Sequence, residues 1–165
     1  MFVILRLKHW QLFLIFAALL FFPMSYYGSI FEIIGVLIYI IWIYLIGKMG
    51  TRYSGFRFDK QQILFFDYSI ALIIILVLVQ FYVLMFYKGH HFLDTNAFQI
   101  ILGSVTGLVY FFMTFYSAKS ISLIHNHKKS SIRQLIPWFF KLIFWPIGIW
   151  TVQPILNKLV SENKM

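Results

Sequence analysis

The chain has 165 residues, of which 61% are hydrophobic and 12% charged, whereas a soluble domain has roughly 45–50% apolar and 25% charged residues. A chain this short cannot bury so much apolar surface in its own core, so the composition excludes an ordinary soluble domain and indicates a membrane protein. The absence of cysteine excludes disulfides, thiolate metal sites and cysteine nucleophiles. The formal net charge is +9. We attribute it to Lys and Arg residues that set the orientation in the membrane and contact anionic lipid headgroups, and we expect no specific nucleic-acid partner.

The first apolar run follows Arg6 and Lys8 in the order of a signal peptide. No small-x-small cleavage site comes after it, which predicts an uncleaved first span. A tight, uncharged connection that begins at Pro23 joins it to the second run as a helical hairpin. Four runs reach, or nearly reach, the about 20 residues that cross a bilayer. The predicted spans are residues 10–27, 29–47, 63–87 and 97–121.

The connections between these spans alternate in charge. Of the fourteen Lys and Arg residues, thirteen fall on the side of the two termini and one, Lys88, falls on the other side. Cytoplasmic loops of membrane proteins carry the excess of Lys and Arg. The sequence therefore predicts an integral protein of a bacterial inner (cytoplasmic) membrane, with both termini in the cytoplasm.

Residues 135–154 are apolar over about 20 residues, enough for a fifth span. That span would place Lys141 and the helix breaker Pro146 near the middle of the membrane. We favour two short helices broken at Pro146, interfacial or re-entrant, with tryptophans at headgroup depth. Ser131 and Gln134 have the spacing of a capping box at the start of the first.

The predicted fold class is an all-α membrane protein, a four-helix transmembrane bundle with a C-terminal interfacial or re-entrant helical segment. The bundle comprises residues 1–121, a basic cytoplasmic linker residues 122–133, and the amphipathic tail residues 134–165.

A few polar residues fall within the predicted spans, where they cost several kcal/mol and are therefore informative. Those with long polar side chains are Glu32, Asp67, Gln80 and Gln99. Gly28, Glu32 and Gly35 recur at helical spacing and predict a stripe on span two that faces protein or water. A lipid-modifying enzyme would need Glu32 or Asp67 beside a cavity with a second polar partner.

Span four carries Gly103 and Gly107 one turn apart, and the same stripe continues to Thr114 and Ser117. Two such glycines let helix backbones approach closely, and the hydroxyls hydrogen-bond across the contact. The pattern predicts helix packing, either within the chain or between copies in a homo-oligomer.

Basic residues gather in the predicted cytoplasmic connections and form a cationic face. This face suits the anionic headgroups of membrane lipids, or else a nucleotide or an acidic partner. Its residues are Arg52, Arg57, Lys60, Lys119, Lys128, Lys129 and Arg133.

The histidines do not predict a metal centre. His90 and His91 fall on the outer side and His125 and His127 on the cytoplasmic side, about 30 Å apart. Catalytic signatures such as GxSxG, HExxH and a phosphate-binding loop are absent. We therefore expect no metal, no cofactor and no catalytic residues.

The leading hypothesis is a non-enzymatic multi-pass protein whose oligomer forms a pore or perturbs the membrane under control of the cationic face. The alternative is an accessory or scaffold subunit that packs against another protein in a larger membrane complex. A small transporter is disfavoured because charges at membrane depth are scarce.

Overall fold

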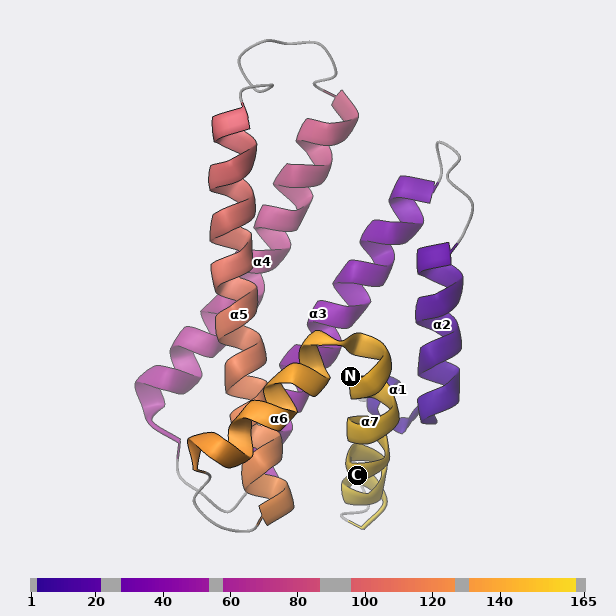
Figure 1. Cartoon of the computed structure of the whole chain (residues 1–165), viewed down its shortest axis with the longest axis vertical. Helices are drawn as coiled ribbons and strands as arrows, with labels where there is room; N and C mark the ends of the chain where they lie inside the picture. Colours follow the sequence, from indigo (N-terminus) through magenta and orange to yellow (C-terminus); the bar gives the residue numbers. More distant parts are fainter. Residues whose placement is uncertain (1–2, 22–27, 54–57, 87–95, 127–130, 163–165) are drawn as a thin grey trace. The chain divides into compact units, whose positions relative to one another are not determined.

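A computed structural model describes residues 3–21, 28–53, 58–86, 96–126 and 131–162, and every element in these ranges is an α-helix (Figure 1). The all-α class is therefore confirmed. The helices are α1 (Val3–Arg6), α2 (His9–Phe21), α3 (Gly28–Tyr53), α4 (Lys60–Phe86), α5 (Asn96–Asn126), α6 (Ile132–Ile143) and α7 (Trp145–Glu162).

Three of the described helices are long and apolar enough to cross a membrane, through the windows Ile33–Tyr53, Lys60–Val83 and Phe98–Asn126. The pair formed by α6 and α7, bent by 116°, passes the same test together and gives a fourth candidate. α2 is apolar but has 13 described residues, and residues 22–27 of the predicted first span lie outside the described ranges. These helices are compatible with an integral membrane protein.

Two helices continue past the predicted ends of their spans. α3 runs on to Tyr53 and α5 to Asn126, whereas the apolar runs end near residues 47 and 121. Hydropathy marks where a segment becomes polar, and neither of these polar extensions contains a proline that would end the helix. Arg52 and His125 lie in the last turns of α3 and α5, where positive charge suits the helix dipole.

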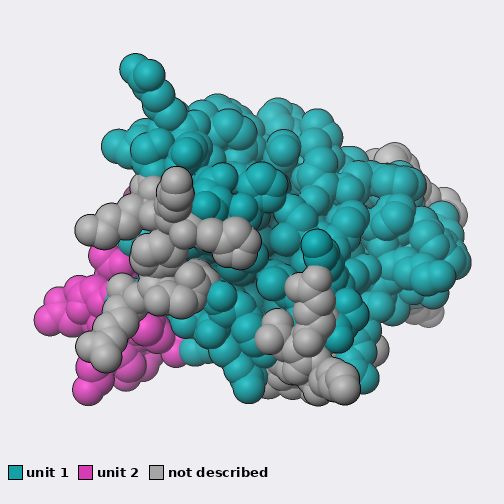
Figure 2. Space-filling model, turned by 90° about the horizontal axis from the view of Figure 1, so that it is seen from below, with its two compact units in different colours: residues 1–58, 114–165 teal, residues 59–113 magenta. Residues whose placement is uncertain are grey.

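The chain divides into two compact units, which Figure 2 shows in different colours. Unit 1 contains residues 1–58 and 114–165, and unit 2 contains residues 59–113. The division falls within α5, whose first part belongs to unit 2 with α4 and whose last part belongs to unit 1.

Within unit 1, α3 and the end of α5 meet through small residues. Ser117 Oγ donates to the carbonyl of Ile43 at 2.8 Å and Ser120 Oγ donates to the carbonyl of Gly47 at 3.3 Å. A Cβ built on Gly50 would lie 2.0 Å from the Cβ of Ser120. The backbones therefore approach more closely than any residue but glycine permits at position 50.

Aromatic rings pack the remaining helices of unit 1 together. α2 packs against α3 and α7, and the ring of Phe16 stands edge-on to Tyr39 with centroids 5.8 Å apart. The ring centroid of Trp145 lies 5.7 Å from that of Phe13 and 5.6 Å from that of Phe16. Fully buried side chains of this core include Leu12, Phe16, Trp42, Ile43, Ile46, Met49, Ile121 and Leu142.

The corner between α6 and α7 lies at Phe144, two residues before the Pro146 at which the break was predicted. In a continuous helix the ring of Pro146 would clash with a carbonyl one turn earlier, so the chain turns before it, and the proline then fits the first turn of α7. A Cβ on Gly148 would lie 2.5 Å from the carbonyl oxygen of Lys141, so the corner also needs glycine there. The predicted capping box is confirmed, with the Ser131 N–H donating to Gln134 Oε1 at 3.3 Å.

The close contact of α3 and α5 predicts a strong response to one added methyl group. Gly50→Ala places that methyl on Ser120 and should lower the free energy of unfolding by about 1–3 kcal/mol, measured by thermal unfolding in detergent. Ala71→Ser, which adds one heavy atom at an exposed position of α4, is the control and should change little. Adding Ser120→Gly to Gly50→Ala should restore part of the lost unfolding free energy. If the effects of the two substitutions on that free energy were simply additive, the contact between the two residues would be contradicted.

Candidate functional site

Unit 2 is a helical hairpin made by α4 and the first part of α5, and in Figure 1 α4 runs obliquely and crosses behind α5. Near one end, the rings of Phe65 and Phe112 meet edge-on with centroids 4.8 Å apart. Toward the other end, Gln80 Nε2 donates to Thr106 Oγ1 at 3.3 Å. Thr106 itself donates to the carbonyl of Leu102 at 2.8 Å, so its oxygen is set to accept from Gln80.

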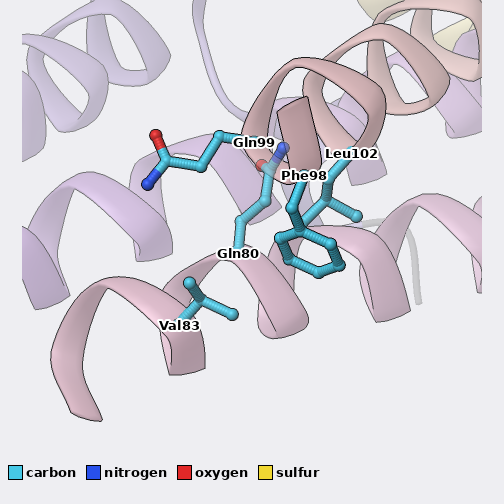
Figure 3. Close-up of a pocket in the computed structure, with 5 residues that line it drawn as sticks. All are labelled: Gln80, Val83, Phe98, Gln99 and Leu102. Atoms are coloured by element: carbon cyan, nitrogen blue, oxygen red, sulfur yellow. The ribbon is translucent and has the colours of Figure 1, made fainter. Parts of the chain in front are cut away.

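A pocket of about 230 Å³ opens beside this hydrogen bond (Figure 3). Its described lining contains two carboxamides, apolar side chains and no charged group. Gln80 is half-buried and Gln99 is exposed, so two of the predicted polar residues share this pocket. The lining residues are Gln80 and Val83 from α4 and Phe98, Gln99 and Leu102 from α5.

The predicted small-residue stripe of α5 has two different surroundings. Gly103 and Gly107 are exposed, and a Cβ added to either would meet no described atom within 4 Å. Thr114 and Ser117 are fully buried in unit 1, where Ser117 bonds α3. The hydroxyl part of the stripe thus packs within the chain, whereas the glycine part, which we name the open glycine face, is uncovered.

The predicted stripe on α3 contributes to the core of unit 1. Gly35 is buried, and Tyr39, one turn later, donates from its hydroxyl to the carbonyl of Leu142 at the end of α6. Gly28 is the first residue of α3, while the side chain of Glu32 lies outside the described part. Asp67 is half-buried on α4 and lines neither described pocket of the hairpin.

Several predicted cations lie over aromatic rings in unit 1. Lys119 Nζ is 5.3 Å from the ring centroid of Phe58, and the Arg52 guanidinium is 5.5 Å from that of Tyr53. Such a contact is electrostatically favourable and holds the cationic side chain over the ring. Lys60 is exposed at the start of α4 and Arg133 is exposed on α6, whereas Arg57, Lys128 and Lys129 lie outside the described residues.

A buried hydrogen-bond network centred on Gln153 was not among the features predicted from the sequence. Its Oε1 accepts from Trp42 Nε1 at 2.8 Å, and its Nε2 donates to the carbonyls of Leu7 at 2.9 Å and Ile4 at 3.1 Å. Asn157 Nδ2 also donates to the carbonyl of Leu7, at 3.2 Å. One α7 side chain therefore joins α3 to the carbonyls of Ile4 in α1 and of Leu7 just after it.

Sequence signals for these missed contacts exist in hindsight. Gln153 is an uncharged polar residue in the apolar segment 135–154, where a polar group needs a partner. Gly47 and Gly50 repeat at the same three-residue spacing as Ser117 and Ser120. Position 50 lay beyond the predicted end of span two, so the match between the two pairs was not recognised.

Comparisons of the chain with protein-family models, with curated proteins and with solved structures find no match.

The Gln153 network predicts a specific loss on removing one carboxamide. Gln153→Leu keeps similar volume but leaves the buried Trp42 Nε1 without its acceptor, at a cost of about 1–3 kcal/mol, and removes one of the two donors to the carbonyl of Leu7. We expect a lower unfolding temperature and faster amide exchange in residues 3–12. Gln61→Leu, an exposed glutamine on α4, is the control and should match wild type. Unchanged exchange in Gln153→Leu would contradict the network.

Proposed function

We propose that this chain is a multi-pass integral membrane protein that acts by assembling into an oligomer, without catalysing a reaction. The observation that carries the proposal is the open glycine face, where neither Gly103 nor Gly107 has a described neighbour within 4 Å of an added Cβ.

The long helices α4 and α5 expose most of their apolar surface. Only 22% of the α4 window and 11% of the α5 window are buried. Exposing so much apolar surface to water would be unfavourable, whereas contact of the same surface with lipid chains has no such cost. Large exposed apolar side chains on the hairpin include Phe65, Leu72, Ile75, Ile100, Ile101, Leu108 and Phe111.

The open glycine face resembles a helix contact that the chain already forms in unit 1. In unit 1, Gly50 lets α3 come close to α5, and serine hydroxyls bond across that contact. Lipid chains are as apolar as leucine, so close packing and hydrogen bonds drive helix association in membranes. Gly103 and Gly107 offer a second surface of this kind, and we assign it to a second copy of the chain.

A cyclic oligomer built on this face would bring polar groups of several hairpins together. Ser104 lies between the two glycines of this face and is exposed on α5. Repeated around an axis, its hydroxyl and the helix backbone at the glycines would line a hydrophilic path. The proposed oligomer is therefore a pore or a membrane-perturbing assembly.

The proposed orientation keeps both termini in the cytoplasm. α6 has 12 residues, a rise of about 18 Å, too short to cross a hydrocarbon core of about 30 Å. Leu135 and Leu142 are buried on one side of α6, while Ile132, Ile136 and Phe140 are exposed. We place this exposed stripe in the cytoplasmic interface, with Arg133 toward anionic headgroups.

Mass measurement tests the oligomer. The purified protein in detergent or nanodiscs should be a closed oligomer, and Gly103→Leu with Gly107→Leu should dissociate it, because the bulk of two leucines keeps the helices apart. Val105→Leu, on the other side of α5, is the control and should keep the wild-type mass. A wild-type monomer would overturn self-association and favour the accessory-subunit alternative, in which the same face meets a foreign helix.

Single cysteines test the orientation, since the chain has no cysteine of its own. In intact cells an impermeant maleimide should label Thr95→Cys, between the third and fourth spans. It should label Ser131→Cys and Ser161→Cys only after permeabilisation. Labelling of Ser161→Cys in intact cells, with Ser131→Cys still protected, would instead make α6 and α7 a fifth, broken span.

A further inference from the structure

The pocket of the hairpin contains hydrogen-bonding capacity that the described chain does not use. A carboxamide has two N–H donors and a carbonyl acceptor. Gln80 uses one donor on Thr106, and Gln99 forms no hydrogen bond with any described residue. Figure 3 shows the side chain of Gln80 extending from α4 toward Phe98 and Leu102 of α5. The carbonyl of Gln80 and the amide of Gln99 thus remain for a ligand.

The position of the pocket limits the kind of ligand. Gln80 precedes the end of α4 at Phe86 by six residues, roughly 9 Å along the helix, and Gln99 follows the start of α5 at Asn96 by three, roughly 4.5 Å. In the proposed orientation, this is the outer edge of the hydrocarbon core. Unsatisfied amides are unfavourable at that depth, and the groups available there are those of lipid heads.

The lining and the volume of the pocket further limit the kind of ligand that it can bind. The described lining contains no charged side chain, so nothing in it would compensate a phosphate. A volume of about 230 Å³ is below the about 300–1,000 Å³ of pockets that enclose a drug-sized ligand. The pocket therefore suits a small neutral head, with Val83, Phe98 and Leu102 against the first methylene groups of its chains.

We propose that Gln80 and Gln99 bind the head of a neutral glycerolipid, such as a diacylglycerol. The amide N–H groups donate to an ester carbonyl, and the carbonyl of Gln80 accepts from the free glycerol hydroxyl. The acyl chains leave the pocket along the exposed apolar surface of α4 and α5. This inference rests on the proposed membrane location and not on self-association.

Photolabelling of the purified full-length protein in detergent tests the site. A dioctanoylglycerol with a diazirine near its glycerol should label the pocket residues saturably, as mapped by tandem mass spectrometry. Unlabelled dioctanoylglycerol should compete, whereas dioctanoyl phosphatidylglycerol should compete far less. Gln80→Leu and Gln99→Leu should each weaken binding about fivefold, as expected for one lost hydrogen bond. Gln61→Leu, roughly 28 Å away along α4, should bind as wild type does.

A second variant separates loss of binding from loss of folding. Leu102→Trp keeps both amides but fills the pocket, and it should abolish labelling while the unfolding temperature stays near that of wild type. Labelling spread over α4 and α5 without saturation, or equal competition by the anionic lipid, would overturn the proposal. Extraction of the protein from membranes by alkaline carbonate would instead overturn the membrane location, so the two failures are distinguishable.

Discussion

The carboxamide of Gln153 holds together three segments of unit 1 that are remote in sequence. It accepts from Trp42 on α3 and donates to the carbonyls of Ile4 and Leu7, and no part of the side chain is exposed. A buried amide must find its partners in the protein. The position of α7 relative to α1 and α3 is therefore fixed by polar groups, and the aromatic contacts of α2 fill the space that this arrangement leaves.

The two units use the same chemistry to different extents. In unit 1 the small residues of α3 and α5 face each other, and the serine hydroxyls find carbonyls. In unit 2 Gln80 of α4 donates to Thr106 of α5, and the glycines of α5 face open space. In unit 2 no described helix packs against the open glycine face, and the amides of the pocket can form hydrogen bonds that the described chain does not supply. The proposed oligomer contact and the proposed lipid site therefore both lie in unit 2.

Predictions from the sequence were confirmed where a feature depends only on residues close together in the chain. A long apolar run is helical whatever its neighbours, so α3, α4 and α5 were located, and the capping box at Ser131 depends only on residues three apart. The break near Pro146 was predicted, but it lies at Phe144, because the proline constrains the turn before it. The extension of α3 to Tyr53 was missed, since hydropathy reports polarity and not helix ends.

The sequence alone determined the all-helical class, the apolar helices long enough to cross a membrane and the polar residues within them, because these follow from composition and local spacing. Only the tertiary structure decided which small residues have another helix packed against them. The stripe of α5 looks continuous in sequence, yet Ser117 packs on α3 and Gly103 meets open space. The partner of a small or polar residue depends on which helix lies opposite, and that is set by contacts such as Gln153 with Trp42, 111 residues apart.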